Sequence, residues 1–123
     1  MSNNSIVMSI YQAPNGFWHW RKTGANLSRR SKVRFLTCAD AWDAARSIAH
    51  ACGYSTEMDL ITWGMVLFQW EVEGRQLYRE GCELEQCGKN RYRRAAWLRE
   101  FSSDAQTVAD RQWATAELEA VAA

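Results

Sequence analysis

The cysteines and histidines of this chain are the first candidates for metal or nucleophilic chemistry, because thiolates and imidazoles serve as metal ligands, nucleophiles and bases. Cys38 and Cys52 are predicted at opposite ends of one helix, roughly 21 Å apart at ~1.5 Å rise per residue, so they can neither bridge nor share an ion. Cys82 and Cys87 have a spacing at the loose end of zinc-finger patterns, and the second pair is missing unless His50 and Cys52 supply it. We expect four free thiols and no bound metal.

The sequence contains no complete catalytic motif. His19 falls in an aromatic segment and His50 near an expected helix end, and neither has a recognisable partner in the sequence. Residues 81–89 contain two glycines and a lysine, but six residues separate the glycines where a Walker loop has four, and Asn90 stands where Ser or Thr is needed. We therefore expect no enzymatic activity and no cofactor.

Two basic runs are the candidate partner-binding residues. They comprise Arg29, Arg30, Lys32 and Arg34 in the first run, and Lys89, Arg91, Tyr92, Arg93 and Arg94 in the second. If the runs converge, their cations would face phosphates while aromatic side chains stack on bases. Alternatively, they pair with the chain's own acids, which cluster in residues 51–88 and 100–123 and leave a net charge of only +1.

The first half of the chain is predicted to form a β-β-β-α unit over residues 6–53. Residues 6–12 and 17–22 are β-prone and flank an Asn-Gly turn signal, so they are expected to form a hairpin. Residues 32–36 are predicted to add a third short strand.

A helix is expected to follow these strands and to cover one face of the sheet. Thr37-x-x-Asp40 is a capping-box variant that predicts the start of this helix, and Gly53 stands where a C-terminal cap belongs. Apolar residues recur at helical spacing between these two ends. Laying this apolar face across the sheet buries it and completes the unit.

Residues 55–80 support two interpretations. The pattern that begins at Thr56 predicts a helix start, and a short helix is expected to end near Gly64. Residues 66–79 then alternate moderately around a tight-turn signal, which favours a hairpin. One long helix over 56–73 is the alternative.

Two helices are predicted to follow. Residues 91–101 form the first, and the capping box Ser103-x-x-Gln106 predicts the start of the second. The elements together predict an α+β fold, with an antiparallel sheet packed by helices. At this length we expect a single domain over residues 1–123, in which 54–123 form the hairpin and the helical half.

No segment is predicted to cross a membrane or to direct secretion. The longest apolar stretch, residues 61–72, contains Gln69 and Glu71 and is too polar to span a bilayer. The first residues carry neither a basic segment nor a long apolar one. We expect a cytoplasmic protein, in which cysteines stay reduced.

The first half also carries a recognisable set of residues. They are Ile10-Tyr11-Gln12, Gly16-Phe17-Trp18-His19-Trp20-Arg21, Gly24-Ala25-Asn26, Ser31-Lys32, Ala39-Asp40-Ala41 and Ile48. This set, over residues 6–52, resembles the YegP-like family of small bacterial domains, which combine an aromatic hairpin, a third strand and a helix, often in tandem copies. The resemblance implies the β-β-β-α fold and a possible degenerate second copy within 54–123, and it implies no activity. The basic residues 28–32 depart from the family pattern.

The composition favours a binding protein. Seven tryptophans are present, and tryptophan is enriched at the centres of protein interfaces. We expect a non-enzymatic protein that contacts a host protein or protein complex. The most specific version of this hypothesis is a phage or mobile-element inhibitor of a host defence system, such as an anti-CRISPR. The alternative is a nucleic-acid-binding protein that uses the basic patches 29–34 and 89–99. Homodimerisation is left open.

Overall fold

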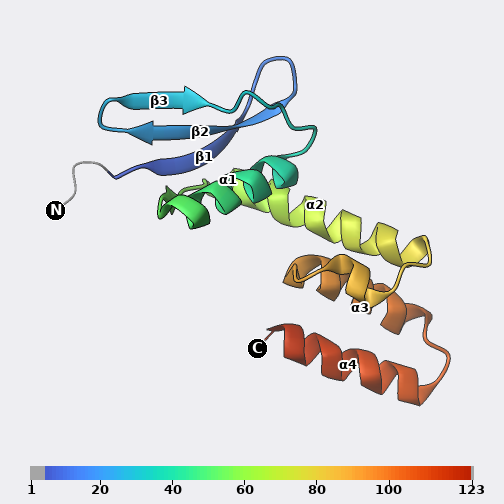
Figure 1. Ribbon diagram of the computed structural model, residues 1–123. Helices are drawn as coiled ribbons and strands as arrows, with labels where there is room; N and C mark the ends of the chain where they lie inside the picture. Colours follow the sequence, from blue (N-terminus) through green and yellow to red (C-terminus); the bar gives the residue numbers. More distant parts are fainter. Residues whose placement is uncertain (1–4, 123) are drawn as a thin grey trace. The chain divides into compact units, whose positions relative to one another are not determined.

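The computed structural model describes residues 5–122, which fall into two compact units. The first unit ends at Val66 and the second begins at Leu67. Four strands and helix α1 lie in the first unit, and α3 and α4 lie in the second (Figure 1). Helix α2 (Leu60–Arg79) contributes residues to both. The α+β fold class is therefore confirmed, whereas the single-domain organisation stays a prediction.

The sheet of the first unit has the strand order β3-β2-β1-β4. Its strands are β1 (Val7–Gln12), β2 (Trp18–Gly24), β3 (Leu27–Arg30) and β4 (Ser55–Thr56). The first three are antiparallel neighbours, as expected, but β4 pairs parallel to β1. The sheet is mixed rather than purely antiparallel, because α1 carries the chain back along the sheet before β4 joins.

Helix α1 (Cys38–Cys52) lies against β1 and β2 and buries one face of the sheet (Figure 1). Met8, Ile10 and Trp18 share that face and are buried. The predicted ends of the helix are confirmed. The Thr37 hydroxyl accepts a hydrogen bond from the backbone N–H of Asp40 at 3.1 Å, and Gly53 ends the helix in the left-handed region at φ 72°.

The third strand lies earlier than predicted. It pairs with β2 from Leu27 onward, because the hairpin turn is short enough for the ladder to resume at once. Residues 32–36 form no strand, and Phe35 makes an isolated antiparallel bridge with Trp18 of β2. The chain leaves the ladder at buried Ser31, whose hydroxyl donates a hydrogen bond to the Val33 carbonyl at 2.7 Å.

The predicted hairpin at 66–79 is wrong, because these residues continue helix α2. The buried positions Val66, Trp70 and Gly74 are four residues apart, which places them on one side of a helix. A Cβ atom at Gly74 would meet the Arg93 carbonyl and would lie 2.9 Å from the Ala96 Cβ atom. This glycine therefore permits a close approach of α3 and makes no turn.

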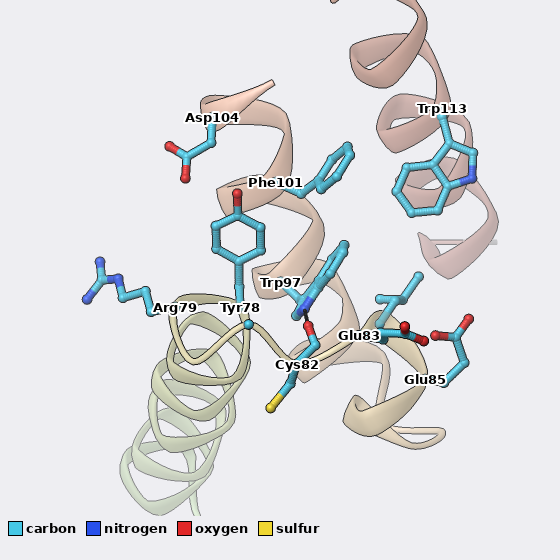
Figure 2. A pocket seen from close by; sticks show the side chains of 11 residues that line it. Tyr78, Arg79, Cys82, Glu83, Glu85, Trp97, Phe101, Asp104 and Trp113 are labelled. Atoms are coloured by element: carbon cyan, nitrogen blue, oxygen red, sulfur yellow. Dashed lines mark hydrogen bonds between the residues drawn. The ribbon is translucent and has the colours of Figure 1, made fainter. Parts of the chain in front are cut away.

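The second unit contains only helices among its described residues, 67–122. They are α2, the short 3-10 helix η1 (Leu84–Cys87), α3 (Arg91–Asp104) and α4 (Val108–Ala122). A second β-β-β-α copy is therefore not formed here. Leu84 and Leu98 belong to a buried core that also includes Trp97, whose indole N–H donates to the Cys82 carbonyl at 2.9 Å (Figure 2).

The last helix begins one turn later than its predicted capping box. Ser103 still belongs to α3, and the Thr107 hydroxyl accepts a hydrogen bond from the backbone N–H of Asp110 at 3.1 Å. Ser103 and Thr107 are each followed three positions later by a polar residue, so the sequence offers two similar capping sites. Among the described residues, no helix is long and apolar enough to cross a bilayer.

The close approach at Gly74 predicts opposite effects for two glycine substitutions in α2. Gly74→Ala is expected to destabilise the protein by about 1–3 kcal/mol, because overpacking against Arg93 and Ala96 outweighs the gain in helix propensity. Gly64→Ala is the control, since a Cβ there meets nothing within 4 Å, and it should stabilise by about 0.5–1 kcal/mol. Urea denaturation followed by circular dichroism measures both. Equal effects at the two positions would contradict the close approach.

Candidate binding surfaces

One candidate site is a pocket of about 760 Å³ in the second unit (Figure 2). Its lining comes from the end of α2, the loop into η1, and helices α3 and α4. The aromatic residues that line it are Tyr78, Trp97, Phe101 and Trp113, and the charged ones are Arg79, Glu83, Glu85 and Asp104. No sequence motif marks this pocket, because its residues are scattered over four elements.

The aromatic rings of the pocket are held in a fixed arrangement. Trp97 and Phe101 stack with centroids 5.4 Å apart, and Trp113 meets them edge-on at 6.5 Å and 5.1 Å. Tyr78 meets the same stacked pair edge-on from α2. Such offset and edge-to-face pairs are favourable beyond the area they bury. The hydrogen bond from Trp97 to Cys82 further fixes the central ring.

Acidic side chains outnumber basic ones around this pocket. Glu83, Glu85 and Asp104 line it together with one cation, Arg79, which lies 3.9 Å from the Glu100 carboxylate. Removal of the Tyr78 ring from water raises the pKa of its hydroxyl, and the hydrogen bond to the Asp104 carboxylate raises it further. The pocket is therefore an aromatic cavity with a negative border.

The first basic run lies on an edge of the sheet in the first unit. Arg29 and Arg30 belong to β3, where they stand directly opposite Lys22 and Arg21 of β2. Like charges directly opposite one another destabilise a strand pair. Lys32 and Arg34, which follow β3, are exposed, and the guanidinium of Arg34 lies 4.4 Å above the centre of the Phe17 ring.

The aromatic side chains beside this run are already in contact with other groups. The Arg21 guanidinium lies 4.5 Å above the Tyr11 ring centre, and Tyr11 also stacks on His19 at 5.6 Å. Phe17 has the Arg34 guanidinium over it. A base that stacked on either ring would displace one of these contacts, so phosphate contacts fit this surface better than base stacking.

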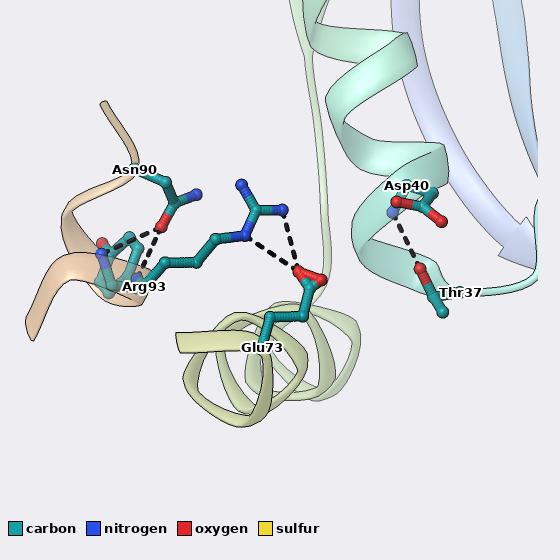
Figure 3. A network of polar contacts seen from close by, with 6 residues as sticks. Thr37, Asp40, Glu73, Asn90 and Arg93 are labelled. Atoms are coloured by element: carbon teal, nitrogen blue, oxygen red, sulfur yellow. Dashed lines mark hydrogen bonds and ion pairs between the residues drawn. The ribbon is translucent and has the colours of Figure 1, made fainter. Parts of the chain in front are cut away.

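The second basic run is engaged by the protein's own groups. Arg93 pairs with Glu73 of α2 through two contacts, at 2.9 Å from Nη2 and 3.0 Å from Nε (Figure 3). Arg91 donates to the Val121 carbonyl at 3.1 Å and Arg94 to the Gly88 carbonyl at 3.2 Å. Tyr92 is stacked on Trp70, with centroids 5.3 Å apart and the planes 8° from parallel.

The position of this run at the start of α3 explains why its side chains contact different parts of the unit. The Asn90 side chain caps α3 by accepting the backbone N–H groups of Tyr92 and Arg93 at 3.0 Å (Figure 3). The four residues after this cap therefore form one helical turn and point in different directions. Lys89, which precedes the cap, is exposed. The two basic runs lie in different units, so their convergence stays a prediction.

His19 and Ser31 form a buried pair that the sequence did not predict. The Nδ1 atom of His19 lies 3.3 Å from the Ser31 hydroxyl oxygen, and the Ser31 proton is donated to the Val33 carbonyl. His19 must therefore donate to Ser31, which is the reverse of the direction that activates a serine nucleophile. The pair anchors the chain where it leaves β3.

The four cysteines are free thiols, as predicted. Cys52 is exposed, Cys82 is half-buried, and Cys38 and Cys87 are buried. Burial raises the pKa of the Cys87 thiol. Within residues 5–122 no three His, Cys, Asp or Glu side chains are grouped so that they could hold a metal ion.

Large apolar side chains stand exposed in the first unit. Leu60 and Ile61, in the first turn of α2, are 87% and 79% exposed, and Met65, one turn later, is 43% exposed. Val33 and Leu36, between β3 and α1, are also exposed. The sequence pattern makes no prediction for Leu60 and Ile61, because exposure depends on which helix face the rest of the fold covers.

No protein-family model, curated protein or solved structure matches this chain. The resemblance of residues 6–52 to the YegP-like family consequently stays a prediction. The three strands followed by a helix agree with the fold that the resemblance implies, although many sequences share such a fold.

The engagement of the second basic run predicts that its arginines support stability. Arg93→Ala is expected to lower the free energy of unfolding by about 1–2 kcal/mol, because it leaves the part-buried Glu73 carboxylate without its partner. Lys89→Ala, next to the same helix, should change it by less than about 0.5 kcal/mol. Urea midpoints of the two variants provide the comparison. An unchanged midpoint for Arg93→Ala would contradict a stabilising role for the ion pair.

Proposed function

We propose that this chain is a non-enzymatic binding protein that acts through protein–protein contact. The observation that carries the proposal is the exposure of Leu60, Ile61 and Met65 on the first turns of α2. Large apolar groups on a regular element, bordered by polar residues, are typical of protein interfaces. Burying each of them against a partner would contribute about 1.5–3 kcal/mol before the costs of association.

The first turn of α2, which carries these residues, is held by an N-terminal cap. Asp59 caps the start of α2, since its carboxylate accepts the Thr62 backbone N–H at 2.9 Å and the Thr62 hydroxyl at 2.8 Å. These hydrogen bonds lower the pKa of the Asp59 carboxyl group, so the cap stays charged at neutral pH. A helix end fixed in this way presents its side chains with little ordering left to be done on binding.

A non-enzymatic role is supported by the state of the candidate catalytic groups. His19 donates to Ser31, and the Ser31 proton is already committed to a backbone carbonyl. The finer form of the proposal is inhibition of a host defence protein by a phage or mobile-element product, as by an anti-CRISPR. Identification of the captured partner is the observation that tests this finer form.

Removing the exposed apolar groups is expected to abolish partner capture without unfolding the chain. The double variant Leu60→Ser/Ile61→Ser should lose a stoichiometric partner from nuclease-treated bacterial lysate, because both side chains are largely exposed. Val108→Ser, at an exposed apolar position of α4, is the control and should retain it. Quantitative mass spectrometry of the bound fraction measures both. Equal capture by wild type and double variant would refute this surface as the contact.

Nucleic-acid binding through β2 and β3 is the second candidate function. It is favoured by the like-charge pairs Arg21–Arg30 and Lys22–Arg29, which disfavour the strand pairing and would be offset by phosphates. Arg91, Arg93 and Arg94 of the second basic run already bond groups of their own unit, so the proposed nucleic-acid surface is confined to the first unit.

Charge reversal on β3 separates binding from folding. Arg29→Glu/Arg30→Glu should stabilise the sheet by about 0.2–1 kcal/mol per pair, because each glutamate then faces a cation. The same variant should weaken binding to a DNA duplex and reduce the slope of log K against log salt by about 1.8, if each arginine contacts one phosphate. Fluorescence anisotropy over a salt series measures this. Duplex binding with an unchanged slope would exclude β3 as the site.

A further inference from the structure

We propose that the pocket of the second unit binds an organic cation whose charge is surrounded by alkyl groups, such as a quaternary ammonium. The proposal rests on the aromatic rings and carboxylates that line this cavity. It stands on the second unit alone, so it does not depend on the protein contact proposed for α2.

The rings supply a surface that attracts a cation. The face of an aromatic ring carries negative charge density, and tryptophan gives the strongest attraction. Trp113 meets both Trp97 and Phe101 edge-on, at 82° and 72°, so it is not covered by parallel stacking on either ring. Trp113 is also 42% exposed, which a role in the core alone does not require.

The carboxylates give the pocket its charge preference. Three acids line it, Glu83, Glu85 and Asp104, against the single guanidinium of Arg79. Figure 2 shows Asp104 beside Tyr78 at one end and Glu83 and Glu85 at the other, with the rings between them. A cation held on the rings therefore has carboxylates at both ends of the cavity, whereas an anion would be repelled.

The mixture of rings and acids selects an alkylated cation over a bare one. A small bare ion needs several oxygen ligands converging on one point, and within residues 5–122 no three His, Cys, Asp or Glu side chains are grouped in that way. Methyl or methylene groups around the charge bury apolar surface against Trp113 and against the half-buried rings of Tyr78 and Phe101. The volume of about 760 Å³ accommodates such a head group together with the chain that bears it.

The decisive comparison uses choline and its uncharged isostere, 3,3-dimethylbutan-1-ol, on the full chain. Nitrogen–proton correlation spectra report the indole N–H signals of Trp97 and Trp113 during each titration. We expect saturable shifts of both signals with choline, and about tenfold weaker binding of the isostere. Equal affinity for both compounds, or no saturable shift with choline, would overturn the proposal.

Two variants locate the binding in this pocket. Trp113→Leu keeps an apolar side chain and removes the aromatic face, and Glu85→Gln removes one exposed charge. Each is expected to weaken choline binding severalfold, whereas Glu119→Gln, an exposed acid of α4 outside this pocket, should not. Unchanged affinity in both pocket variants, with circular dichroism confirming their fold, would also overturn it.

The cation could belong to a free metabolite or to a modified lysine, and peptides distinguish these sources. A short peptide with trimethyl-lysine is compared with choline, and the same peptide with unmodified lysine is the control, which should bind more weakly than the methylated one. Tighter binding of the methylated peptide than of choline would assign the pocket to a protein-borne cation. Equal or weaker binding would assign it to a free one, and either result is consistent with the proposed chemistry. Loss of lysate capture by the α2 variant with choline binding intact would separate this site from the α2 contact.

Discussion

The close approach of α2 and α3 at Gly74 is the constraint on which the rest of the second unit depends. With no side chain at this position, the Arg93 carbonyl can lie against the α2 backbone. The approach sets Arg93 beside Glu73 and places Tyr92 flat on Trp70. The absence of one methyl group thus allows both Tyr92 and Arg93 to contact α2.

Basic residues have opposite surroundings in the two units: they meet acceptor groups in the second unit and other cations in the first. In the second unit, basic residues of α3 are satisfied by a carboxylate and by backbone carbonyls of the same unit. In the first, β2 and β3 set cations against cations across the ladder. Charge therefore contributes to folding in one unit, while in the other it opposes strand pairing.

Sequence reasoning located those elements whose signals are local. The Thr37 cap and Gly53 bound α1 as expected, because a cap depends on residues within one turn of it. The prediction for 66–79 failed because Glu73-Gly74 is a common turn signal in sequence. The actual reason for Gly74, the close approach of α3, is visible only in the folded structure. The pocket could not be predicted at all, since Tyr78, Trp97 and Trp113 come together only through tertiary packing.

The parallel pairing of β4 with β1 has a consequence for synthesis on the ribosome. Val7 pairs with Ser55, so the sheet closes only after more than forty further residues have left the exit tunnel. The β1–β2 hairpin and α1 can form earlier, because their contacts are local in sequence. During that interval the outer edge of β1 keeps unpaired backbone groups, which can recruit another strand. The short β4 then pairs with Val7 and Met8, which shortens the edge of β1 that is open to another strand.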